Sequence, residues 1–163
     1  MLTTLRFLEP RDIADLRLEQ LVVPGLVIDV RDVARAHETL PFSILEGLDL
    51  RGRSLLFYSG WSAHWGEAAY GAYPFLGREI VEALRAAKPA IVGVDFLTVD
   101  DPADPERPCH NSLLKDDILI SENLTNLGAL FDHPRAREEG SRGRTRVVSG
   151  FTYFAVPVKV RSA

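Results

Sequence analysis

The chain has 163 residues, of which 46% are hydrophobic and 26% charged, and its formal net charge is −4. This length and composition are typical of one globular domain with a substantial core. The weakly acidic balance provides no basic surface for nucleic acid, and no apolar run approaches the ~20 residues of a membrane-spanning helix. The single cysteine excludes an intramolecular disulfide. Since the N-terminus also has no signal-peptide pattern, we expect a reducing, cytoplasmic location.

Two buried strands are predicted in the first part of the chain. The apolar residues 25–30 predict a strand covered on both faces, with Asp29 near its end as a paired structural carboxylate. Residues 31–52 are interpreted as a loop with one helical turn, and residues 53–59 predict the next strand, which ends at Gly60.

The segment that follows this second strand, residues 61–66, is the most aromatic part of the chain. Trp61 and Trp65 bracket His64 there. On a loop after a strand, two indole rings can form an apolar wall for an aryl ligand, and the imidazole can supply a polar group. Covering the core edge or filling a subunit interface explains the two tryptophans equally well.

The clearest helix is predicted for residues 77–88, because their apolar side chains recur on one face and Pro89 ends the pattern. Residues 90–96 then predict a central strand, so strand, helix and strand form a βαβ unit with parallel strands. Asp95 ends this strand and is the favoured functional acid of the region. The acids and prolines of residues 100–108 are expected to form an extended, solvated loop.

Residues 109–127 contain the strongest candidate for a functional site. His110 opens a short helical segment, and the apolar residues 118–120 predict a buried strand that ends at Glu122. Ligands of open α/β sheets bind at the carboxyl ends of strands, where His110 and Glu122 are expected to converge. Both are ordinary ligands of zinc or manganese, but two donors make only half of a site. The alternative is a surface histidine beside a capping Glu-Asn pair.

The last part of the chain predicts a charged loop followed by strands. Residues 132–146 carry charges of both signs and are interpreted as a surface connection. Residues 147–160 predict one or two aromatic-rich β segments with at least one buried face.

The spacing His110-x11-Glu122, followed by Asn-Leu-Thr-Asn-Leu, resembles the C-terminal metal-ligand segment of the cyclase family of metal-dependent hydrolases, which includes kynurenine formamidases (arylformamidases). The likeness extends through residues 16–30, 58–66, 91–100 and 151–160. The resemblance implies a swivelling β/β/α fold: a single α/β domain over residues 1–163, with a mixed sheet and flanking helices. It also implies assembly as homodimers or homotetramers.

The same resemblance implies a chemistry. In the family, one or two divalent ions, zinc or manganese, activate water against an N-formyl arylamine such as N-formylkynurenine, or against a cyclic amide. His110 and Glu122 match metal-ligand positions of this family. Trp61, His64, Trp65 and Asp95 are the candidate substrate-binding residues.

The N-terminus departs from the family pattern. Family members begin with a His-x-Gly-Thr-His-x-Asp-x-Pro-x-His-Phe motif, which supplies two histidine ligands, an aspartate ligand and a proton-transfer histidine. If Phe7 is the last residue of this motif, Arg6 replaces its final histidine and Leu2 its aspartate, and the ligand histidines would precede Met1. The C-terminus also looks short. We therefore expect an incomplete metal site, in either a hydrolase, a non-catalytic relative that binds small molecules or associates with subunits, or a truncated product without activity.

Overall fold

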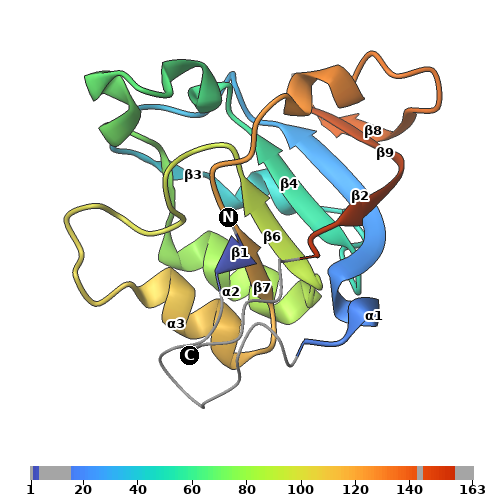
Figure 1. Ribbon diagram of the computed structural model, residues 1–163, viewed down its shortest axis with the longest axis horizontal. Helices are drawn as coiled ribbons and strands as arrows, with labels where there is room; N and C mark the ends of the chain where they lie inside the picture. The colour runs from blue at the N-terminus through green and yellow to red at the C-terminus, as the bar shows by residue number, and fades with distance from the viewer. Residues whose placement is uncertain (1, 4–15, 143–144, 157–163) are drawn as a thin grey trace, which may run out of the picture.

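The computed structural model describes residues 2–3, 16–142 and 145–156. Within this part of the chain, seven strands form one mixed sheet in the order β1-β7-β6-β4-β2-β9-β8 (Figure 1). The strands are β1 (Leu2–Thr3), β2 (Val22–Asp29), β4 (Ser54–Tyr58), β6 (Ile91–Val94), β7 (Leu119–Ser121), β8 (Arg137–Arg142) and β9 (Thr145–Phe154). A separate parallel pair joins β3 (Thr39–Leu40) to β5 (Phe75–Leu76).

Three α-helices and several short 3-10 helices connect the described strands. The α-helices are α1 (Leu18–Leu21), α2 (Arg78–Ala87) and α3 (Pro108–Lys115), and the 3-10 helices are η2 (Phe42–Leu45), η3 (Trp61–His64), η4 (Ala68–Gly71) and η5 (Leu127–Leu130). None of the helices in the described part is long and apolar enough to cross a membrane.

The centre of the sheet is parallel and buried on both faces. Strands β2, β4, β6 and β7 run in the same direction and are hydrogen-bonded in succession. Helices α2 and α3 lie over one face (Figure 1), where Leu84 and Leu113 pack against Phe57 and Val94 in the main core. A smaller cluster on Val27 and Leu56 covers the other face. This double coverage explains the continuous apolar runs of the parallel strands.

The structure confirms a mixed sheet with flanking helices in one α/β domain. The helix expected for residues 77–88 is α2, and the strands expected for residues 25–30, 53–59, 90–96 and 118–120 are β2, β4, β6 and β7. Asp29 is a paired carboxylate, as expected, since Arg31 binds it with 2.7 Å between Nη2 and Oδ2.

The interpretation of residues 132–146 as a loop is wrong. Residues 137–142 form β8, which pairs antiparallel with β9 at the edge of the sheet. An edge strand tolerates charges because its outer side faces water, so a strand there does not need an apolar pattern. Glu139 of β8 binds Arg53, with 2.6 Å between Oε2 and Nη1, which ties this edge to the start of β4. Of the β segments expected for residues 147–160, the last residues lie outside the described part.

Gly93, in the middle of β6, allows the sheet to pack closely against its cover. A Cβ atom at this position would lie 2.5 Å from Cδ2 of Leu56 and 2.8 Å from Cδ1 of Leu124. Leu56 is buried at 1% exposure and has little room to retreat. We therefore expect Gly93→Ala to lower the free energy of unfolding by about 1–3 kcal/mol, measured by urea denaturation.

Gly71 in η4 provides the matched control, because a Cβ there meets no heavy atom within 4 Å. Gly71→Ala should change the free energy of unfolding by less than about 0.5 kcal/mol. Equal effects of the two substitutions would contradict the close packing at Gly93.

Candidate functional site

Three buried polar side chains meet at the carboxyl ends of β6 and β7. His110, Asp100 and Glu122 have exposed fractions of only 1%, 2% and 4%. The His110 ring joins the two carboxylates: Nδ1 lies 2.5 Å from Oδ2 of Asp100, and Nε2 lies 3.4 Å from Oε1 of Glu122. The structure therefore brings the two residues of the sequence prediction together and buries the histidine, which excludes the alternative of a surface His110.

Backbone hydrogen bonds hold this cluster in place. The Val99 N–H donates to Oε1 of Glu122 at 3.1 Å, and the Cys109 N–H donates to Oδ1 of Asp100 at 2.6 Å. The segment after β7 is bonded to the end of β6, because the Leu124 N–H donates to the Val94 carbonyl at 3.0 Å. Adjacent parallel strands thus deliver both acids to the edge of the sheet where α/β folds bind ligands.

Helix α3 supplies the histidine from its first turn. Pro108 occupies the first turn and Arg107 is the N-cap residue, with φ 49° and ψ 56° in the left-handed region. Cys109 is buried on the same helix, and its thiol donates to the Leu76 carbonyl at 3.0 Å. Burial raises the pKa of this thiol, so Cys109 is a structural residue and not a nucleophile.

The charges of the cluster are mutually dependent. Burial by itself would lower the pKa of His110, but its hydrogen bonds to Asp100 and Glu122 outweigh burial and raise the pKa above the ordinary value. Burial would likewise raise the pKa of Asp100, but the hydrogen bonds from His110 and from the Cys109 N–H outweigh it and lower the pKa. A buried carboxylate and imidazole thus stabilise each other's charged form.

Arg107 is the third charged neighbour of His110. Its Nη2 lies 3.2 Å from Nε2 of His110, and its Nε lies 3.8 Å from Oδ2 of Asp100. A guanidinium group only donates hydrogen bonds, so Nε2 must accept through its lone pair in this contact. Arg107 therefore favours the neutral ring, with its proton on Nδ1 and directed to Asp100, whereas Glu122 favours the imidazolium. Of the two contacts with Nε2, that of Arg107 (3.2 Å) is shorter than that of Glu122 (3.4 Å).

Asp100 and Arg107 were not predicted as residues of the site. Both lie in the loop that was expected to be solvated, and Asp101, Asp104 and Glu106 of this loop are indeed partly or fully exposed. Asp100 differs because it directly follows the buried Val99. Its place at the end of an apolar run was the available signal.

Asp95, a predicted substrate-binding residue, is fully buried at the end of β6. Its carboxylate accepts the Ser59 N–H at 2.9 Å, the Ser59 hydroxyl at 2.5 Å and the Gly60 N–H at 2.8 Å. Burial raises the pKa of Asp95, while these hydrogen bonds oppose the rise. The observed contacts make Asp95 the residue that fixes the junction between β4 and the aromatic segment, and its contact with a substrate stays a prediction.

The aromatic segment begins directly at this junction. Trp61 is half-buried against the main core, and its indole N–H is buried without an acceptor among the described residues. The rings of Trp61 and His64 meet edge to face at 5.2 Å, and Nδ1 of His64 lies 3.3 Å from Oε2 of Glu67. His64 is therefore placed at the surface and does not belong to the buried cluster.

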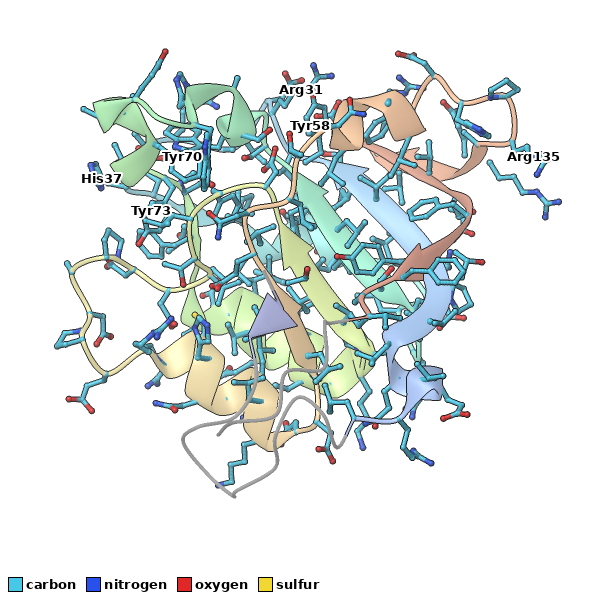
Figure 2. All side chains as sticks on the ribbon, in the orientation of Figure 1. Arg31, His37, Tyr58, Tyr70, Tyr73 and Arg135 are labelled. Atoms are coloured by element: carbon cyan, nitrogen blue, oxygen red, sulfur yellow. The ribbon has the colours of Figure 1, made fainter. Side chains whose placement is uncertain are left out.

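Trp65 is connected to the cluster through a tyrosine. It is 68% exposed and meets Tyr70 edge to face at 5.2 Å. The Tyr70 hydroxyl donates to Oδ1 of Asn123 at 2.8 Å, next to Glu122 in sequence. Figure 2 shows Tyr70 and Tyr73 in the loop region beside the carboxyl ends of the parallel strands. Trp65 and Tyr70 thus form an aromatic border of the acidic site, of which Trp65 is the exposed part.

The described residues fit part of a metal site. Two ligands of one tetrahedral ion, with bonds of about 2.0–2.2 Å, lie roughly 3.3–3.5 Å apart. The 3.4 Å between Nε2 of His110 and Oε1 of Glu122 agrees with this spacing. Among the residues that the structure describes, however, no group of three or more His, Cys, Asp or Glu side chains is placed to hold an ion. Two donors do not complete a catalytic site, and the motif register of Arg6 and Phe7 lies outside the described residues.

The lowered pKa of Asp100 predicts a pH dependence of stability. A group whose pKa is lower in the folded state stabilises the protein above its unfolded pKa of about 3.9, and this stabilisation disappears as the pH falls through the folded-state pKa. Near pH 6, Asp100→Asn should lower the free energy of unfolding by about 1–3 kcal/mol. Below about pH 4 this deficit should shrink, because the wild-type carboxyl becomes protonated.

Urea denaturation at several pH values measures this difference. Glu106→Gln removes an exposed acid from the same loop and is the control, which should match the wild type across the range. A deficit of Asp100→Asn that stays constant from pH 6 to pH 3 would show that the charge of Asp100 is not what stabilises the site.

Comparisons with known proteins agree with this architecture. Among the solved structures that share the fold is isatin hydrolase A from Ralstonia solanacearum, with 23% identity, coverage of 88% of this chain and 65% of that chain, and a TM-score of 0.65. Two others are isatin hydrolase A from Labrenzia aggregata bound to benzyl benzoate (19%, 87% and 65%, 0.63) and a potential metal-dependent hydrolase with cyclase activity (20%, 83% and 68%, 0.59). The chain thus spans about two thirds of the length of these proteins.

The sequence itself identifies the family. A search of curated proteins gave no match. The Cyclase family model, described as "Putative cyclase", matches residues 5–101, which is more than half of the chain. The parallel strands β2, β4 and β6 all lie within the matched segment. The chain therefore belongs to the Cyclase family.

Proposed function

We propose that this chain is a cyclase-family amide hydrolase that acts on an aryl amide, and that arylformamidase is its closest activity. The substrate would be an N-formyl arylamine such as N-formylkynurenine, or a related cyclic amide. The observation that carries the proposal is the buried pair of His110 and Glu122, 3.4 Å apart at the carboxyl ends of the parallel strands. Family membership supports the assignment of a hydrolytic site to this pair.

Aromatic side chains support an aryl substrate. Trp65 is 68% exposed and Leu97 42% exposed. The side-chain amide of Asn123 joins them to the site, because it accepts from Tyr70 beneath Trp65 and donates to the Leu97 carbonyl. Isatin, the substrate named for two structural neighbours, is a cyclic amide on an aryl ring, so isatin and aryl formamides both present an amide carbonyl on an aryl nitrogen.

We further propose a divalent cation, zinc or manganese, at His110 and Glu122. Such an ion, when bound, supplies a Lewis acid and lowers the pKa of water. Asp100 supports this role because it binds Nδ1 of His110; in the neutral ring Nε2 then carries the free lone pair, 3.4 Å from Oε1 of Glu122. The described residues supply two donors, so the other donors would come from residues outside the described part or from a second copy of the chain in a homo-oligomer.

A non-catalytic relative is the second candidate. Two observations favour it: the described residues supply only two donors, and Arg107 contacts Nε2 of His110. Neither suits a strongly held ion. In that case the scaffold and its aromatic border would bind small molecules or associate with subunits.

Turnover with added metal separates the two candidates. Purified protein supplied with Zn²⁺ or Mn²⁺ should hydrolyse N-formylkynurenine or isatin, and chelation should remove the activity. His110→Ala and Glu122→Gln should each reduce kcat/KM by more than about 100-fold, because changes to residues that merely orient metal ligands already cost 10- to 100-fold. His133→Ala changes an exposed histidine elsewhere and is the control.

The pattern of results decides the assignment. Binding of an aryl amide without turnover in the presence of either metal would support the non-catalytic relative. If the protein neither binds nor hydrolyses an aryl amide, both candidates are contradicted.

The aromatic border predicts a specific loss of affinity. Trp65→Ala should weaken binding of an aryl ligand by about 3- to 10-fold, because aromatic contacts contribute about 0.5–1.5 kcal/mol. Calorimetric titration measures this dissociation constant without using tryptophan fluorescence. Phe42→Ala removes another exposed aromatic side chain, from η2, and should leave the affinity unchanged. Equal affinities of Trp65→Ala and the wild type would remove Trp65 from the substrate site.

A further inference from the structure

We propose that Arg107 is a built-in competitor for divalent cations at the His110–Glu122 pair, because its guanidinium contacts the ring nitrogen that would ligate the ion. This inference rests on the proposed assignment of His110 and Glu122 as metal ligands. Arg107 would control the access of the ion to these ligands.

Arg107 and a metal ion would use the same lone pair, that of Nε2 of His110. Nδ1 of His110 is engaged by Asp100, so Nε2 is the nitrogen left for a ligand. Nη2 of Arg107 lies 3.2 Å from Nε2 and has only protons to offer, so it occupies the Nε2 lone pair. A metal ion needs the same lone pair. The two contacts therefore exclude each other on one histidine.

Arg107 also supplies a positive charge that a bound cation would otherwise supply. Asp100 and Glu122 are buried carboxylates, and buried charges require a compensating partner. Arg107 supplies a positive charge to this cluster, with Nε 3.8 Å from Oδ2 of Asp100. A bound divalent cation would serve the same electrostatic purpose. It would also repel the guanidinium, so the arrival of the ion and the departure of Arg107 are coupled.

The Arg107 side chain is free to move away from His110 into solvent. Its side chain is 43% exposed, whereas those of Asp100 and His110 are 3% and 1% exposed. The Arg107 guanidinium lies on the solvent side of the buried pair of Asp100 and His110, at the N-terminal end of α3. Moving the guanidinium into water leaves the hydrogen bond between Asp100 and His110 in place. The site thus retains its orientation for an ion while Arg107 weakens the binding of that ion.

Removal of the Arg107 charge tests the competition. Asparagine is the replacement of choice, because it adopts the left-handed backbone conformation of Arg107 more readily than most residues. In calorimetric titrations of metal-free protein, Arg107→Asn should bind Zn²⁺ at least 10-fold more tightly than the wild type. Arg107→Lys keeps the positive charge and should stay within about 3-fold of the wild type.

Two controls locate the effect. Arg51→Asn removes an exposed arginine from a turn and should not change the affinity for Zn²⁺, which excludes a general effect of net charge. The double variant Arg107→Asn/His110→Ala should lose the gain, which locates the ion at His110. The proposal is overturned if Arg107→Asn binds Zn²⁺ no better than the wild type. It is also overturned if the gain in affinity persists in the double variant.

A measurement on the unaltered chain avoids any effect of substitution on folding. Phenylglyoxal modifies accessible arginines, and mass spectrometry can report the rate at each site. Saturating Zn²⁺ should accelerate the modification of Arg107 and leave Arg51 unchanged. An unchanged rate at Arg107 overturns the proposal.

The inference and the proposed hydrolase activity fail separately. If Arg107→Asn gains affinity for Zn²⁺ but no variant hydrolyses N-formylkynurenine or isatin, the competition stands and the activity is wrong. If the wild type turns over with metal and Arg107→Asn gains no affinity, the activity stands and the competition is wrong.

Discussion

The hydrogen bond between Asp100 and Nδ1 of His110 is the interaction on which the candidate site depends. It lies in a buried environment, where an unpaired carboxylate or imidazole would be costly. The bond holds Nδ1 and leaves Nε2 3.4 Å from Oε1 of Glu122. Without it, Nδ1 of His110 would lose its partner in a buried environment. Both the proposed binding of a metal ion and the observed contact with Arg107 use the lone pair that this bond makes available.

The parallel sheet gives the cluster its position. Because β6 and β7 are adjacent and run in the same direction, the segments after them meet at one edge of the sheet. Asp95 and Asp100 follow β6 and perform different tasks. Asp95 anchors the junction between β4 and the aromatic segment, whereas Asp100 orients His110. One strand thus organises both the polar cluster and the aromatic border.

The proposed pair of metal ligands, His110 and Glu122, has a cationic neighbour, which explains why both a hydrolase and a non-catalytic relative are candidates. The spacing of His110 and Glu122 suits a shared ion, while Arg107 already supplies a positive charge there. A site of this kind remains electrostatically balanced with or without an ion. In the proposed competition, an internal and an external cation would set its occupancy.

Local sequence patterns determined the fold class and the main elements. The apolar face of α2 and the doubly buried runs of β2, β4 and β6 are properties of short segments, so their periodicity was sufficient to predict them. The ends of strands also placed His110 and Glu122 at one edge. In contrast, β8 was missed, because an edge strand with a wet outer side has no apolar pattern.

Only the tertiary structure decided which polar residues share the site. Asp100 and Arg107 belong to a loop rich in acids and prolines; the end of an apolar run marks Asp100, but no local pattern separates Arg107 from its neighbours in this loop. The burial of Asp100 and His110 accompanies the docking of α3 beside β7, whereas the contact between Arg107 and His110 spans only three residues at the start of α3. A local pattern does not show which side chains a docked helix buries, so the sequence by itself determined the scaffold and the pair of candidate ligands. The folded chain decided what surrounds them.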